Sequence, residues 1–166
     1  MSNDLLFSIG PYRKEFDKQI VDLILRIQNE EAQLDISAAD QPDIISIQSS
    51  YIDNGGGFWV AHDSCAVVGT VGLQRIDSAV GILKKFFVHP AYRGMQGGPA
   101  FRLYSTLVEY ARFSGIRTLL LDTPEIAIRS HAFYTKAGFR QIDKGDLPVH
   151  YDYPDRRSLL FRLDLE

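Results

Sequence analysis

The sequence predicts a mixed α+β domain organised around one central sheet, and three observations support this prediction. Short apolar runs are separated by the two-residue polar connections 63–64 and 77–78, which is typical of antiparallel hairpins. An apolar strand, a glycine-rich turn, a helix and a second apolar strand then follow in the order of a right-handed parallel crossover. The chain ends in two more strand patterns joined by a polar loop. We therefore expect a mixed, mostly antiparallel sheet with one parallel crossover, flanked by about four helices.

The first part of the chain is expected to supply one strand and two helices. A short strand is predicted over residues 5–9. An amphipathic helix is predicted over residues 11–30, because its apolar residues recur at helical spacing: Phe16, Ile20, Leu23, Ile24 and Ile27. A second, shorter helix is predicted over residues 42–51, with Pro42 near its first turn.

Further strands and two longer helices follow. The strands are predicted over residues 58–61, 67–75, 79–88, 118–121, 139–142 and 158–163. The helix that begins at Pro99 has one polar and one apolar side, and Gly115 is a natural cap at its end. A last helix over residues 126–137 is expected to stop at Gly138, and residues 143–157 form a long polar loop.

Composition and charge narrow the class of protein. With 166 residues, of which 45% are hydrophobic and 23% charged, the chain is expected to form a single domain, residues 1–166. A formal net charge of −3 argues against nucleic acid or an anionic membrane as the main partner. The lone Cys65 and the absence of a signal-peptide pattern predict a cytoplasmic location. The histidines show no metal-ligand spacing, so no metal is expected.

The most informative segment is the basic, glycine-rich turn between the strand 79–88 and the helix that begins at Pro99. Such a turn directs several backbone N–H groups to one point, and the helix start adds unpaired donors and the positive end of its dipole. Pro99 suits the first helical position, because a helix makes no use of the N–H there. A phosphate or pyrophosphate site is one interpretation, and a tight strand-to-helix turn is the other.

Two segments carry a resemblance to a known family. The first is residues 85–94, KFFVHPAYRG, and the second is residues 130–139, SHAFYTKAGF. In these segments, and in the order of the elements around them, the chain resembles the GNAT superfamily of N-acetyltransferases over nearly its whole length. The first segment is similar to that family's fourth strand and pyrophosphate loop, and the second to its Phe-Tyr-x-x-x-Gly-Phe helix end.

The resemblance implies a site for acetyl-CoA between the strands 79–88 and 118–121, which are expected to splay near Phe87 and Val88. The pantetheine arm would pair with the backbone there like an added strand. The pyrophosphate is expected on the turn and the helix start, which comprise Arg93, Gly94, Met95, Gln96, Gly97, Gly98 and Pro99. Lys136 is either a contact to the coenzyme's outer phosphate or a solvated charge at a helix C-terminus. Gln96 stands where the family usually has glycine, which leaves the affinity for coenzyme A open.

The resemblance also implies direct transfer of the acetyl group to a primary amine through a tetrahedral intermediate. Tyr134 matches the family's general acid for the leaving thiolate, since a phenol with a pKa near ~10 is protonated at neutral pH. Simple packing beside Phe133 is the alternative role for Tyr134. The base stays open, because Lys84 and Lys85 occupy the strand on which many members carry a carboxylate. The candidates are Glu30, Glu31, Asp40, Asp43, Asp122 and Glu125.

The expected acceptor is a small-molecule amine, since no basic face suggests RNA and no repeat suggests a peptide scaffold. Tyr151 and Tyr153 are predicted either to gate the acceptor pocket or to pack within the late loop. Dimers are common in the family, so a homodimer is left open. A second hypothesis is a module that binds or senses coenzyme A with little or no turnover, which Gln96 and the missing strand carboxylate keep open.

Overall fold

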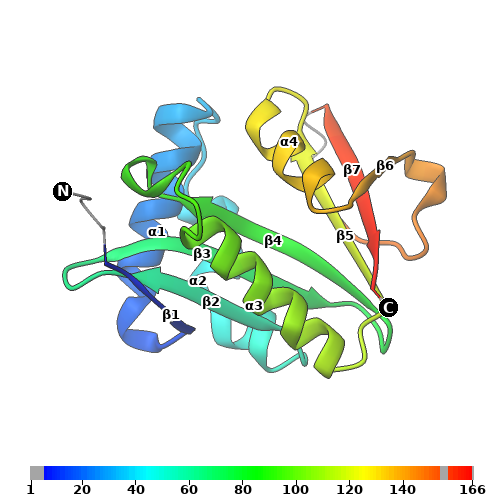
Figure 1. The fold of residues 1–166 in the computed structure, drawn as a ribbon, viewed down its shortest axis with the longest axis horizontal. Coiled ribbons are helices and arrows are strands. Elements are labelled where there is room, and N and C mark those ends of the chain that lie inside the picture. The colour runs from blue at the N-terminus through cyan, green and yellow to red at the C-terminus, as the bar shows by residue number, and fades with distance from the viewer. Residues whose placement is uncertain (1–5, 154–156, 166) are drawn as a thin grey trace.

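The computed structural model describes residues 6–153 and 157–165. Within them lies a seven-stranded sheet with the strand order β1-β2-β3-β4-β5-β7-β6 (Figure 1). The strands are β1 (Ser8–Pro11), β2 (Gly57–His62), β3 (Val67–Arg75), β4 (Val80–Val88), β5 (Thr118–Pro124), β6 (Arg140–Ile142) and β7 (Ser158–Asp164). The α-helices are α1 (Asp17–Arg26), α2 (Pro42–Ile45), α3 (Pro99–Phe113) and α4 (Ile128–Lys136). This arrangement confirms the predicted fold class.

All strand pairs but one are antiparallel within the described residues. β1, β2, β3 and β4 form consecutive antiparallel pairs, and the hairpin connections predicted two of these, β2 with β3 and β3 with β4. β4 and β5 pair in parallel because α3 crosses between them, and β7 lies between β5 and β6 in antiparallel register. The parallel ladder is short, since it joins only residues 80–82 to residues 118–120.

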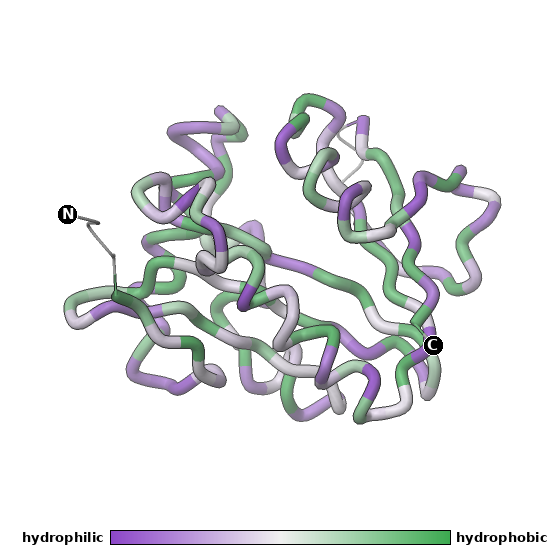
Figure 2. The backbone as a smooth tube through the Cα atoms, viewed as in Figure 1, coloured by the Kyte–Doolittle hydropathy of each residue, from purple (hydrophilic) through white to green (hydrophobic). Residues whose placement is uncertain are grey.

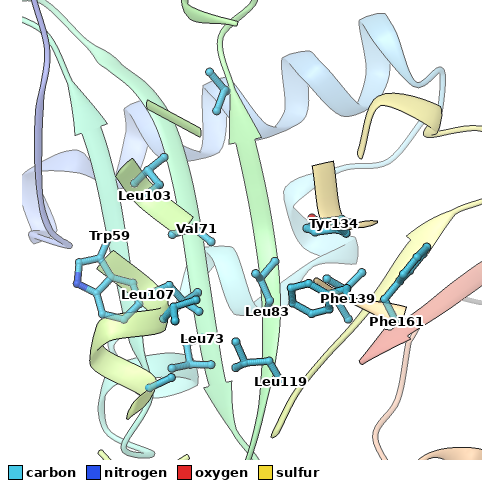
Figure 3. Close-up of a cluster of buried hydrophobic side chains, with 14 of the residues drawn as sticks. Trp59, Val71, Leu73, Leu83, Leu103, Leu107, Leu119, Tyr134, Phe139 and Phe161 are labelled. Atoms are coloured by element: carbon cyan, nitrogen blue, oxygen red, sulfur yellow. The ribbon is translucent and has the colours of Figure 1, made fainter. Parts of the chain in front are cut away.

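Helices cover both faces of the sheet (Figure 1). α3 and α4 lie on one face, which we call the α3 face, and α1 and α2 lie on the other, the α1 face. On the α3 face, Leu103 and Leu107 of α3 pack on strand residues that include Leu119 (Figure 3). Leu121 also packs on the α3 face, whereas Leu120 packs on the α1 face, so β5 is buried on both sides.

The first strand and the start of the first helix lie later in the chain than predicted. The predicted bounds of the first strand, residues 5–9, are wrong: β1 covers Ser8–Pro11 and pairs along β2, and residue 5 lies outside the described residues. Pro11 is tolerated in β1 because this strand is at the edge of the sheet, where a backbone N–H need not be donated. α1 therefore begins after a 3₁₀ turn, Lys14–Phe16, and not at residue 11.

Both predicted N-terminal helices are interrupted. α1 ends at Arg26, and the chain continues as a wider π-helical turn, Ile27–Glu31. The predicted helix over residues 42–51 breaks at Ser46, whose φ of −127° and ψ of 59° are not helical. α2 is consequently a single turn, and a second π-helical turn, Gln48–Ile52, follows it. Burial of side chains from both pieces against the sheet compensates for the broken helix, because Ile44 and Tyr51 are both almost fully buried.

The later elements keep their predicted order with small shifts. β5 extends past residue 121 to Pro124, because β7 pairs with it along this whole length. The loop after β6 begins with a 3₁₀ turn, Lys144–Asp146, and residues 154–156 of the loop lie outside the description. Figure 2 shows mostly apolar colouring along the central strands, with a polar interruption within β4. Across the described ranges, no helix combines the length and the apolar content that a membrane crossing requires.

The packing of α3 on the sheet can be tested at Leu107, whose side chain is 0% exposed. Leu107→Ala should lower the free energy of unfolding by about 2–5 kcal/mol, through lost burial and the cavity that remains. The same substitution at Leu6, which is 83% exposed, should change it by less than about 0.5 kcal/mol. Urea denaturation measures both variants, and equal losses would contradict this packing.

Candidate functional site

An opening between β4 and β5 is the most distinctive feature of the sheet. The parallel ladder ends at Ile82 and Leu120, and the two strands then diverge (Figure 1). Beyond that point β4 stays paired with β3, and β5 stays paired with β7. Each strand therefore has one edge without a strand partner in the described residues, and an extended ligand can pair with such an edge. Phe87 and Val88 lie on the β4 edge of this opening, although the divergence begins before them.

A β-bulge in β4 directs two lysines to the α1 face. The register with β3 shifts between Thr70 and Gly72, and Lys85 has a φ of +52°. The Thr70 hydroxyl donates a hydrogen bond to the Lys85 carbonyl at 2.7 Å, which stabilises the bulge. Lys84 lies opposite Gly72, and the Lys85 ammonium donates to Gln41 Oε1 at 2.6 Å. The sequence gives no signal for this bulge, because lysine rarely adopts a left-handed backbone.

Three glycines of the glycine-rich turn are required by its geometry, two for their backbone conformation and one for space. Gly94 and Gly97 have φ values of +71° and +67°, in the left-handed region. Gly98 is needed for space, since a Cβ there would lie 2.8 Å from the Met95 Cβ. Gln96 has no positive φ, so its side chain causes no backbone strain at this position. The departure of this sequence from the family pattern is therefore accommodated by the glycines around it.

The turn presents backbone donors that have no partner among the described residues. The N–H groups of residues 94–97 make no backbone hydrogen bond within the described part of the chain, whereas the Gly98 N–H donates to the Met95 carbonyl at 3.1 Å. α3 begins directly after Gly98, with Pro99 at its first position, and its first turn adds further free N–H groups. Left-handed residues that alternate with others create a concave cluster of N–H groups that suits an anion.

Arg93 connects the turn to the end of the first helical region. Its guanidinium donates to the two carboxylate oxygens of Glu31 at 2.5 and 2.9 Å, and its Nε donates to the Val88 carbonyl at 2.9 Å. The hydrogen bond from Arg93 lowers the pKa of Glu31, and burial opposes this shift. Since the Arg93 charge is already paired with a carboxylate, the capacity of the turn to bind an anion lies mainly in its backbone.

Tyr134 of α4 lies beside the opening on the α3 face (Figure 3). Its ring packs against Phe86 and Phe139, with centroid distances of 6.4 and 5.6 Å. It also contacts Phe133 at 5.9 Å, as the packing alternative predicted. Burial raises the pKa of the Tyr134 hydroxyl, and the negative charge of Asp122 raises it further. Among the described residues the Tyr134 hydroxyl has no hydrogen-bond partner. Every fully buried polar side-chain atom in these residues does have a partner, so the Tyr134 hydroxyl is not fully buried and reaches solvent.

Asp122 of β5 lies at the same opening on the α1 face. Leu120 and Asp122 share this face because alternate residues of a strand point the same way. The Tyr151 hydroxyl donates a long hydrogen bond to Asp122 Oδ1, at 3.4 Å. Burial raises the pKa of Asp122, while the charge of Lys84, the Tyr151 hydrogen bond and the charge of Lys85 oppose the shift. The late loop thus contributes Tyr151 to this site.

The other candidate bases either have structural partners or lie in solvent. The Asp43 carboxylate accepts a hydrogen bond from Tyr51 at 2.5 Å and lies 3.7 Å from a lysine ammonium. Glu30 forms an exposed ion pair one helical turn away. Asp40 closes a capping box in a short 3₁₀ turn, and Glu125 is exposed beyond β5.

Comparison with known proteins identifies the family. Residues 21–139 match the acetyltransferase (GNAT) family. The chain belongs to the GNAT family. The IAA acetyltransferase of Azospirillum brasilense is 34% identical over 154 residues, which cover 92% of this chain and 87% of that protein. N-acetyltransferase 8B of Rattus norvegicus is 31% identical over 110 residues, 64% of this chain and 50% of that protein, so the matched region spans about half of this longer relative.

Solved structures agree with this assignment. An acetyltransferase from Streptococcus agalactiae has a TM-score of 0.92 and 41% identity, covering 96% of this chain and 98% of that one. A GNAT-family acetyltransferase from Staphylococcus aureus has a TM-score of 0.90 and 31% identity, covering 97% and 100%. An acetyl-CoA-bound GNAT acetyltransferase from Elizabethkingia anophelis, with a TM-score of 0.65 and 18% identity over 98% of this chain and 100% of that one, shares the fold. The predicted family is confirmed. The described residues contain no group of His, Cys, Asp and Glu that is arranged to hold a metal ion.

The ion pair between Glu31 and Arg93 should contribute to stability in a pH-dependent way. Because Arg93 lowers the pKa of Glu31 in the folded protein, this contribution is present above the unfolded pKa, near ~4.3, and is lost as the pH falls through the folded pKa. Glu31→Gln should therefore lower the free energy of unfolding at neutral pH by at most about 1 kcal/mol, because the partly exposed pair is screened. The difference should shrink as the pH falls below ~4.

Chemical denaturation of the wild type and the variant across this pH range measures the effect. Glu30→Gln removes the same charge one residue earlier and breaks only an exposed helical pair, worth about 0.3–0.5 kcal/mol. If the difference in free energy of unfolding between the wild type and Glu31→Gln does not change with pH, the ion pair between Glu31 and Arg93 is not the cause of that difference.

Proposed function

We propose that this protein is an N-acetyltransferase that moves the acetyl group of acetyl-CoA directly onto a primary amine of a small molecule. The observation that carries the proposal is the opening between β4 and β5, because the glycine-rich turn follows β4 directly and the Tyr134 ring packs against Phe86 of β4. Membership of the GNAT family supports the reaction class. In this proposal residues 1–166 act as one acyltransferase domain and form no covalent intermediate with the acetyl group.

The coenzyme is proposed to lie along the opening with its phosphates at the start of α3. The pantetheine arm would pair with the free edge of β4, and the pyrophosphate would accept hydrogen bonds from the backbone of the turn. Lys136, exposed in the last turn of α4, is the proposed partner of the outer phosphate. The full set of proposed coenzyme contacts is Phe87, Val88, Arg93, Gly94, Met95, Gln96, Gly97, Gly98, Pro99 and Lys136.

Tyr134 is proposed to act as the general acid. As the amine nitrogen bonds to the thioester carbonyl carbon, the oxygen gains negative charge that a backbone N–H near Val88 would stabilise. When the carbon–sulfur bond then breaks, the thiolate takes the proton of the Tyr134 hydroxyl. The raised pKa of Tyr134 keeps this proton in place at neutral pH until it is needed.

A second candidate is a module that binds coenzyme A with little or no turnover. Lys84 and Lys85 favour this candidate, because they occupy the strand where many family members carry a carboxylate. Gln96 does not favour the binding module over the enzyme, because the backbone conformation at this position does not require glycine. Turnover therefore separates the two candidates better than binding does.

Acetyl-CoA at 100 times its dissociation constant should stabilise the protein by about 2.7 kcal/mol, measured as a thermal shift. A panel of primary amines with thiol detection should then show steady release of free coenzyme A with at least one amine. Stabilisation without thiol release across a broad panel would support the binding module instead. Absence of any stabilisation at saturating acetyl-CoA would contradict both candidates.

Tyr134→Phe keeps the buried ring and removes the proton donor. Its kcat should fall by about 10²–10⁴-fold, while stabilisation by acetyl-CoA is retained. Tyr104→Phe is the matched control, because Tyr104 lies in the same aromatic cluster, 5.6 Å from Phe133, and it should keep the wild-type kcat. Unchanged turnover of Tyr134→Phe across pH would rule out the acid role.

A further inference from the structure

We infer that Asp122 is the general base of the reaction, the group that removes a proton from the ammonium form of the acceptor. This inference rests on the proposed function. It selects one residue among the carboxylates that the sequence leaves open as candidates, and three structural observations support it: the face on which Asp122 lies, its few partners, and its electrostatic relation to Tyr134.

The first observation is that the two faces of the sheet have different roles at the opening. The anion-binding turn leads into α3, and Tyr134 packs in the α3-face core, so the coenzyme phosphates and the leaving thiol belong to that side. The acceptor must then approach the thioester from the α1 face. There β4 supplies Lys84, β5 supplies Asp122 and the late loop supplies Tyr151. Asp122 is the carboxylate of this group.

The second observation is that Asp122 is less engaged than its competitors. Glu31 is held by two hydrogen bonds from Arg93, and Asp43 by a short hydrogen bond from Tyr51. Asp122 forms no close ion pair within the described ranges, and its Tyr151 contact is long, at 3.4 Å. A carboxylate must have a free lone pair to accept a proton, and Asp122 retains one.

The proton balance is complete with these two residues. Asp122 takes one proton from the ammonium ion, and the freed lone pair attacks the carbonyl carbon. The carbon–nitrogen bond forms, the carbon–sulfur bond breaks, and the thiolate takes the Tyr134 proton. The second proton lost by the acetylated nitrogen restores Tyr134, and Asp122 releases its proton to water. The products are an amide, free coenzyme A and one proton.

The third observation couples the two residues. The charge on Asp122 is one cause of the raised pKa of Tyr134. When Asp122 accepts the ammonium proton, this charge disappears, so Tyr134 becomes a better acid at the stage at which the thiolate leaves. Among the described residues, the other charged or titratable groups that act on Asp122 are Lys84 and Lys85 from β4 and Tyr151 from the late loop, and the Tyr153 ring contacts the Tyr151 ring at a tilt.

Asp122→Asn, assayed with an acceptor amine of pKa near ~10, tests the inference through the pH profile of kcat/KM. At neutral pH the variant should lose about 10²–10⁴-fold in kcat/KM, with stabilisation by acetyl-CoA retained. The loss should shrink as the pH approaches the pKa of the amine, because the acceptor then arrives already deprotonated. Since the folded protein raises the pKa of Asp122, the charged form disfavours folding at neutral pH, and the melting temperature of the variant should not fall.

Two further variants keep the test specific. Tyr151→Phe removes a hydrogen bond that lowers the pKa of Asp122, so the acidic limb of the profile should move to higher pH. Asp43→Asn, on the same face, should keep the acidic limb of the wild type. A pH-independent loss in Asp122→Asn, or loss of the limb in Asp43→Asn, overturns the inference while the proposed function stands. Failure of the wild type to release thiol with any amine overturns both.

Discussion

The short parallel ladder between β4 and β5 is the constraint on which the rest of the structure depends. Only residues 80–82 and 118–120 pair, so the two strands separate while each keeps a partner on its other side. β7 pairs with all of β5, which keeps β5 extended as far as Pro124 although β4 has left it. The result is a gap in the middle of one sheet that has ordered backbone on both sides.

The two sides of this opening differ in chemistry. On the α3 face the residues beside the opening form an aromatic cluster, which includes Phe86, Phe133 and Tyr134. On the α1 face the residues beside it are charged or hydroxylated, as Lys84, Asp122 and Tyr151 show. One parallel ladder that ends early therefore produces an opening with an aromatic side and a polar side. The bulge at Lys85 sharpens this division, because both lysines are directed to the polar side.

The sequence predicts what depends on local pattern. The order of the strands, the α3 crossover, the glycine-rich turn and the position of Tyr134 follow from periodicity, caps and two motifs. The sequence does not predict contacts between distant segments, such as Arg93 with Glu31, which are 62 residues apart. It also misses the bounds of β1, because pairing with β2, and not the apolar run near the start of the chain, sets where this strand begins and ends. The sequence also does not predict the bulge at Lys85, because a contact between two strands, the hydrogen bond from Thr70 of β3, stabilises it.

The lysines of β4 have a different meaning once their surroundings are known. In the sequence, Lys84 and Lys85 replace an expected carboxylate and raise doubt about catalysis. In the structure, Lys85 is held by Gln41 and lies 3.7 Å from Asp43, whereas the charge of Lys84 acts on Asp122. Burial raises the pKa of Asp122, which favours the protonated form, and a protonated carboxyl group cannot accept a proton. The charge of Lys84 opposes that rise. In the proposed reaction, Lys84 of β4 and Asp122 of β5 would together take the role that a carboxylate on β4 has in many family members.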